Sequence, residues 1–161
     1  MLPVEEFDSP DALRERFQLL CGRGAASNRF HAIDEPPMSV IAGEAGRSAR
    51  ATMQVPTSTS FFGDHFPRRA VFPATLLLNA QMRLALQLAQ AATPARAAAT
   101  LFPSRMTNVK MRSFILPGQT VEIAAEMAPS QDDTLTTLLS ASVEGRKVAT
   151  ARLEIKARST P

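Results

Sequence analysis

A run of helix-forming residues between two prolines constrains the fold of this chain more than any other feature. The segment 74–92 is dominated by Ala, Leu, Gln and Met, which all have high helix propensity. Pro73 stands immediately before the segment and Pro94 closes it, because proline cannot continue a helix. The segment is apolar around most of its circumference, so we expect one long and largely buried helix.

One polar line interrupts this predicted helix. Asn79, Arg83, Gln87 and Gln90 recur at helical spacing, so they stack along one face. A helix that is otherwise apolar needs a polar surface or seam opposite such a line. The same four side chains argue against a membrane span, which requires about 20 predominantly apolar residues.

The remaining periodicity predicts strands. The last third, about 106–156, has the pattern of an antiparallel meander. At the other end of the chain, a short helix capped by Ser9 is expected over about 9–20. The candidate strands are residues 39–42, 49–55, 106–116, 120–128, 135–143 and 148–155. One long helix with a meander of strands predicts a single α+β domain over residues 1–161.

Composition and charge narrow the function. Cys21 is the only cysteine and the N-terminal residues are acidic, so we expect a reducing, cytoplasmic location without a signal peptide. Two histidines and one cysteine are too few for a zinc site, so no metal is expected. No acidic residue occurs between His65 and Val121, where Arg68, Arg69 and Arg112 lie. This segment favours an acidic partner; nucleic acid is not expected, because no nucleic-acid motif is present.

The segment FFGDHFPRRAVFPATLLLN, residues 61–79, carries the main functional motif. It resembles the active-site motif of the hot-dog 3-hydroxyacyl-ACP (acyl carrier protein) dehydratases of the FabA/FabZ type. His65-Phe66-Pro67 and Pro73 match that motif, and Asn79 falls where the family has its catalytic carboxylate. Residues 109–119 and 143–149 are also similar to family segments, so the resemblance covers roughly residues 39–156.

The resemblance implies a dimer-forming hot-dog fold, in which an antiparallel sheet wraps around one long central helix. It also implies dehydration of a 3-hydroxyacyl group that is carried on the phosphopantetheine of ACP, with no other cofactor. Such a reaction needs a base, an acid and donors for the thioester oxygen. His65 would be the base, Asn79 the substituted acid position, and Ala74 at the helix N-terminus the oxyanion donor. The implied tunnel residues are Phe62, Phe66, Phe72, Pro73 and Arg83, and the implied ACP-binding residues are Arg68, Arg69 and Arg112.

The departures from the motif leave three functions open. Asn79 can orient a water or hydroxyl group but cannot deliver a proton, and Ala74 replaces a family glycine while keeping its N–H. The chain could be a working dehydratase of a fatty acid, polyketide or polyene pathway. It could instead be a catalytically incomplete hot-dog subunit that completes or supports a heteromeric dehydratase; as a partner, a second copy or another hot-dog subunit is expected, in a homodimer or a heterodimer. The third alternative is an acyl thioesterase or acyl-binding module.

Overall fold

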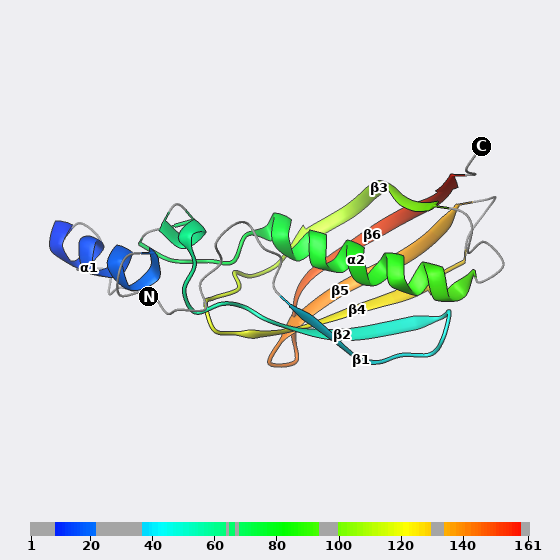
Figure 1. The fold of residues 1–161 in the computed structure, drawn as a ribbon, viewed down its shortest axis with the longest axis horizontal. Helices are drawn as coiled ribbons and strands as arrows, with labels where there is room; N and C mark the ends of the chain where they lie inside the picture. The colour runs from blue at the N-terminus through cyan, green and yellow to red at the C-terminus, as the bar shows by residue number, and fades with distance from the viewer. Residues whose placement is uncertain are drawn as a thin grey trace.

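The computed structural model describes residues 9–21, 37–63, 65–66, 68–93, 100–129 and 134–158. Within these residues, six strands form one antiparallel sheet in the order β1-β2-β4-β5-β6-β3. The strands are β1 (Met38–Ala42), β2 (Ser48–Gln54), β3 (Thr100–Met111), β4 (Thr120–Ala128), β5 (Leu135–Val143) and β6 (Arg146–Arg158). The helix α2 (Ala74–Ala92) lies lengthwise across one face of this sheet (Figure 1).

The helix α2 occupies the range that its sequence predicts, and one stripe of it is buried against the sheet. The stripe consists of Leu77, Ala80, Gln81, Leu84, Ala85, Leu88 and Ala89. Opposite it, Val121, Ile123 and Ala125 of β4 are buried, whereas Glu122 and Glu126 between and beside them are exposed. This alternation is typical of an antiparallel sheet that packs on one face only. The core therefore lies between α2 and the inner face of the sheet.

The polar line of α2 faces away from the sheet, as the helical spacing predicts. Asn79 and Arg83 are half-buried, and Gln87 and Gln90 are exposed. Gln81 does not belong to this line, and its side chain is fully buried in the sheet-facing stripe. Among the described residues, no helix is both long and apolar enough to cross a membrane.

Strand β3 differs from its prediction, which was 106–116. It begins earlier, at Thr100, and ends at Met111, and it pairs with β6 from Thr100 opposite Arg158 to Met111 opposite Ala149. Pro103 lies within β3, which is an edge strand in the sheet order. A proline is tolerated there because its missing N–H would otherwise face solvent.

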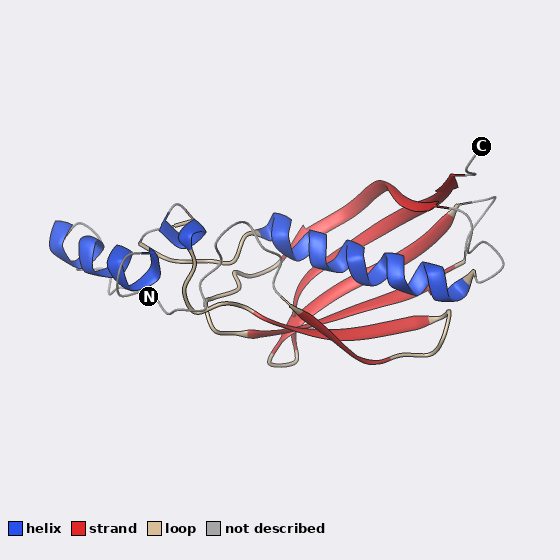
Figure 2. Cartoon of the chain, in the orientation of Figure 1, coloured by secondary structure: helices blue, strands red, loops and turns tan. Residues whose placement is uncertain are grey.

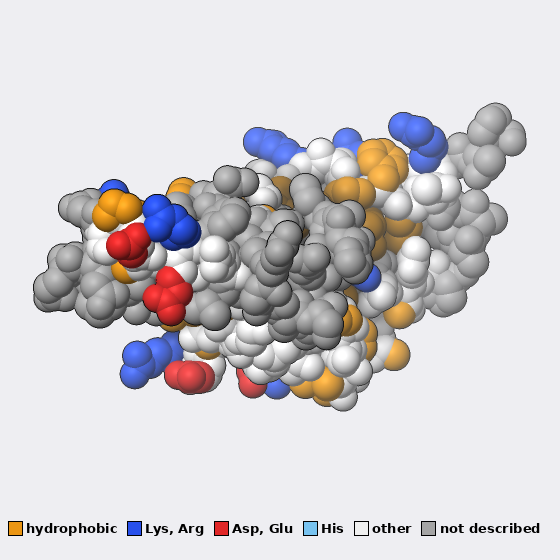
Figure 3. Space-filling view, turned by 60° about the vertical axis from the view of Figure 1, so that its left-hand side comes forward, with side chains coloured by type: hydrophobic (Ala, Val, Ile, Leu, Met, Phe, Trp, Pro, Cys, Tyr) orange, Lys and Arg blue, Asp and Glu red, His pale blue; other side chains and the backbone are white. Residues whose placement is uncertain are grey.

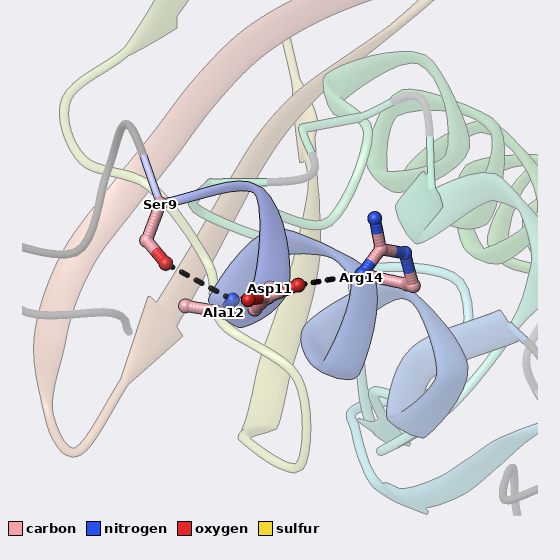
Figure 4. Close-up of polar contacts among 4 residues, drawn as sticks. All are labelled: Ser9, Asp11, Ala12 and Arg14. Atoms are coloured by element: carbon pink, nitrogen blue, oxygen red, sulfur yellow. Dashed lines mark hydrogen bonds and ion pairs between the residues drawn. The ribbon is translucent and has the colours of Figure 1, made fainter.

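The first helix, α1 (Pro10–Cys21), lies beyond one end of the sheet and contacts the short 3₁₀ helix η2 (Ser60–Gly63) (Figures 1 and 2). Its start follows the predicted capping. The Ala12 N–H donates to Ser9 Oγ at 3.3 Å, and Arg14 Nη1 pairs with Asp11 Oδ1 at 2.6 Å (Figure 4). The side-chain cap satisfies one N–H that the helix itself cannot satisfy.

Candidate active site

A short loop between η2 and α2 holds His65 in place through main-chain hydrogen bonds. The His65 N–H donates to the Phe61 carbonyl at 2.9 Å, and the His65 carbonyl accepts from the Val71 N–H at 3.0 Å. Phe66 and Arg69 exchange two further main-chain bonds, of 3.3 and 3.1 Å, and the His65–Phe66 peptide bond is cis. These main-chain hydrogen bonds fix the backbone conformation of the loop that carries the His65 imidazole.

The loop is joined to a segment that is distant in the sequence. The Phe72 N–H donates to the Ile115 carbonyl at 2.7 Å, and both of these side chains are buried. The segment around Ile115 follows β3, and the N–H of its Arg112 donates to the Val148 carbonyl of β6 at 2.8 Å. The end of β3 and the start of α2 therefore form two walls of one site.

A cavity of about 640 Å³ lies between these walls. Its described lining residues are His65, Phe66, Arg69, Val71, Phe72, Ala74, Met111, Arg112, Ser113, Phe114 and Ile115. The half-buried His65 ring stacks on the Phe66 ring, with centroids 4.5 Å apart. No carboxyl group occurs among these described lining residues. The cavity thus offers an imidazole, two guanidinium groups and mostly apolar walls.

The N-terminus of α2 opens into this cavity at Ala74. Pro73 precedes the helix in an extended conformation, and no side chain caps it. The Pro73 carbonyl accepts the N–H groups of Leu76 and Leu77 at 3.1 and 3.2 Å. The N–H of Ala74 belongs to the first turn, which has no acceptor within the helix and carries the positive end of its dipole. An oxyanion beside Ala74 would therefore be stabilised.

Two cationic side chains stand at the rim. The Arg69 guanidinium lies over the Phe114 ring, 4.9 Å from its centroid, and Arg112 lines the opposite segment. Both arginines are exposed, and Figure 3 shows Lys and Arg side chains along the upper edge of the molecule. Within the described part of the chain, no group of three or more His, Cys, Asp or Glu side chains could hold a metal ion.

The cavity brings together only some of the residues proposed from the sequence. Those that line it are His65, Phe66, Arg69, Phe72, Ala74 and Arg112. Phe62, Arg68, Pro73, Asn79 and Arg83 are not among its described lining. Phe62 instead lies in the core, where its ring meets Phe61 edge-on at 4.8 Å. Met111 and Ile115 also line the cavity, but they are not among the site residues proposed from the sequence.

Asn79 lies on the side of α2 that faces away from the sheet. It is two residues from Leu77 and two from Gln81 in the buried stripe, which is about 200° around the helix from each. Arg83 follows one turn later on the same side, and both side chains are half-buried. The position that carries the family carboxylate is thus directed away from the sheet.

The arrangement of one long helix across a six-stranded antiparallel sheet defines a hot-dog fold. A family model described as ApeI-like, ApeI dehydratase, matches residues 42–152. The chain therefore belongs to the ApeI-like dehydratase family. The structural description and the sequence resemblance agree on this class of protein.

Solved structures with the same fold are similar to this chain at low sequence identity. A thioesterase from Haemophilus influenzae is 14% identical, with a TM-score of 0.62, over 83% of this chain and 85% of that one. A mutant thioesterase from Pseudomonas aeruginosa is 15% identical, with a TM-score of 0.60, over 74% and 80%. A hot-dog-like protein from Thermanaerovibrio acidaminovorans is 16% identical, with a TM-score of 0.60, over 72% and 84%. The comparison with curated protein sequences gave no match.

Proposed function

We propose that this chain binds a 3-hydroxyacyl thioester carried on acyl carrier protein and removes water from it. One observation carries the proposal: the cavity combines His65 with the uncapped N-terminus of α2 between apolar walls. An imidazole can take a proton from carbon, and first-turn N–H groups can stabilise the thioester oxygen. Membership of the ApeI-like dehydratase family supports the same chemistry.

His65 would accept the proton from C2 of the acyl group. The electrons of the C2–H bond form the C2=C3 double bond, and the C3–O bond breaks. The departing hydroxyl group takes up a proton and leaves as water. During this step negative charge builds on the thioester oxygen, and the Ala74 N–H would donate to it. The Phe66, Phe72 and Phe114 side chains would enclose the acyl chain.

In this proposal the departing hydroxyl group takes its proton from a water molecule, which the amide of Asn79 from a second protomer would hold in place, because an amide can orient a water but cannot itself give a proton. Asn79 lies outside the described cavity lining of its own chain and is directed away from the sheet. In a dimer, α2 of one protomer would approach the His65 cavity of its partner. Strand β3 is suited to such pairing, because it is an edge strand with Val109 and Met111 exposed. Sedimentation at micromolar concentration should show a species of twice the monomer mass, and a monomer would contradict this arrangement.

The second candidate is a catalytically incomplete subunit, and the amide at Asn79 favours it. An amide cannot supply the proton that the family carboxylate supplies. A different hot-dog chain with a carboxylate at that position could complete the site in a heterodimer. The isolated chain would then bind the acyl thioester without turning it over.

A single experiment separates the candidates. The pure chain is incubated with 3-hydroxyacyl-ACP, and the products are followed by mass spectrometry. Enoyl-ACP that disappears in the His65→Ala variant supports the dehydratase. Tight binding without product supports the incomplete subunit, and free acid from hydrolysis supports the thioesterase alternative. Neither binding nor product would reject an acyl-ACP substrate altogether. The Arg158→Gln variant is the control, because Arg158 is the last residue of β6 and does not line the His65 cavity.

A further inference from the structure

We propose that the outer face of the sheet carries a second site, which binds a phosphorylated small molecule. A groove of about 530 Å³ lies on this face, within the size range of small-molecule sites. Its floor includes Ser140 of β5 and Thr150 of β6, which alternate along their strands with residues buried under α2. The groove therefore lies on the side of the sheet that faces away from the helix.

Four cations line this groove, namely Lys110, Arg112, Lys147 and Arg152. The strand register brings them together, since Lys110 is opposite Thr150 and the Arg112 N–H bonds to the Val148 carbonyl. Like charges on adjacent strands repel each other. An anion bound among them would relieve that repulsion, so the groove favours a negatively charged ligand.

The described lining of the groove holds four cations and one carboxylate, whereas Glu122 and Glu154 of the same face lie outside that lining. Glu126 is the only acidic residue among the described lining residues. It lies on β4, and the register places Leu138 of β5 between it and Arg152. Two strand spacings separate the backbones of Glu126 and Arg152 by about 10 Å. The ion pairs found in the described residues join Arg14 to Asp11 and Arg47 to Glu44, and none involves a groove cation.

The chemistry of the groove fits a phosphate group attached to a less polar body. Arginine binds phosphate oxygens in a bidentate manner, and the hydroxyl groups of Ser140 and Thr150 can donate to further oxygens. Leu138 is 48% exposed and provides an apolar contact beside them. This site does not depend on acyl chemistry, so the proposal stands or falls separately from the dehydratase.

The test is calorimetric titration of the full chain with pyrophosphate and with ADP at low salt. We expect saturable binding that weakens as the salt concentration rises, and tighter binding of ADP if the apolar contact is used. The double variant Lys110→Gln/Arg152→Gln should lose about tenfold or more in affinity, since each charged hydrogen bond contributes that order of effect. Glu126→Gln should bind more tightly. Arg112 is left unchanged, because it also lines the His65 cavity.

The matched control is Arg105→Gln/Lys156→Gln. It removes two exposed cations from the same two strands, β3 and β6, outside the groove. Circular dichroism and thermal melting establish that both double variants are folded. Absence of saturable binding to either probe, or equal loss in the two double variants, would overturn the proposal. A third outcome would also overturn it: neither probe binds, and the groove variant dissociates an oligomer of the chain. The outer face would then be an interface between copies of the chain.

Discussion

The guanidinium group of Arg69 lies over the ring of Phe114, 4.9 Å from its centroid, at the rim of the His65 cavity. Arg69 comes from the loop before α2, and Phe114 comes from the segment after β3. Their contact therefore joins the two walls of the site. Phe114 is 60% exposed, so the contact contributes only about 0.5–1 kcal/mol, and the Arg69 charge stays accessible to an acidic partner.

Reversal of this charge should weaken the use of carrier-bound substrate selectively. We expect Arg69→Glu to raise KM for 3-hydroxyacyl-ACP, with little change in KM for a short pantetheine thioester, because rim charges act mainly on association. Arg68→Glu and Arg112→Glu should act in the same direction. The matched control is Arg158→Glu, which removes a cation 5.3 Å from the Phe102 ring, away from the cavity. Equal loss with both substrates, or an affinity that is indifferent to salt, would contradict this role.

A carboxylate at position 79 should create or raise dehydratase activity in the isolated protein. General acid catalysis contributes about 10²–10⁴-fold in rate, so Asn79→Glu or Asn79→Asp should increase kcat within that range, measured as enoyl-ACP formed. His65→Ala in the same background should abolish the gain. Arg83 lies one turn further along α2 and favours an ionised carboxylate, so Arg83→Gln should enlarge the effect.

Two outcomes bear on the origin of the acid. If a partner subunit supplies it, wild-type chain should gain activity when that partner is added, without any mutation. A wild-type chain that dehydrates at full speed alone, with no change in Asn79→Asp, would contradict the assignment of position 79. The protonation would then have to come from another group.

Replacement of Gln81 should stabilise the fold. Its side chain is fully buried in the sheet-facing stripe of α2, and both its amide atoms lack a hydrogen-bond partner. An unsatisfied buried polar group costs about 1–3 kcal/mol, so Gln81→Met should raise the free energy of unfolding by about that amount in denaturant titrations. Gln87→Met, exposed on the same helix, should change it by less than about 0.5 kcal/mol. A loss of stability in Gln81→Met would indicate an internal partner such as a buried water.

Alanine at two turn glycines should distinguish backbone strain from packing. Gly46 and Gly145 have φ of +72° and +74°, and a Cβ at Gly46 would lie 3.1 Å from Ala92 Cα, whereas one at Gly145 would meet nothing within 4 Å. Both substitutions cost about 1–2 kcal/mol for the left-handed conformation. Gly46→Ala should cost about 1–3 kcal/mol more, from overpacking against the end of α2. Equal thermal destabilisation of the two variants would mean that the β1–β2 turn shifts to accommodate the added Cβ at no further cost in free energy.

Local signals account for the parts of the fold that the sequence predicts well. Helix propensity and flanking prolines determine α2 from Ala74 to Ala92, and the alternation of Val121, Ile123 and Ala125 determines the buried face of β4. These features depend on residues within a few positions of each other. The fold class and the position of His65 just before the helix follow from the same local information and from the family motif.

Tertiary structure alone decided which distant segments meet. The pairing of β3 with β6 runs from Thr100 through Pro103 to Met111, and the cavity is lined by Met111 and by residues 112–115 that follow it. The orientation of α2 on the sheet buries Gln81 against the sheet and places Asn79, half-buried, on the side that faces away from it. The cations of the outer groove likewise come from β3, from the residue that follows it and from β6, which are neighbours only in the sheet. Contacts between segments far apart in the chain are set by packing and register, and no short stretch of sequence encodes them.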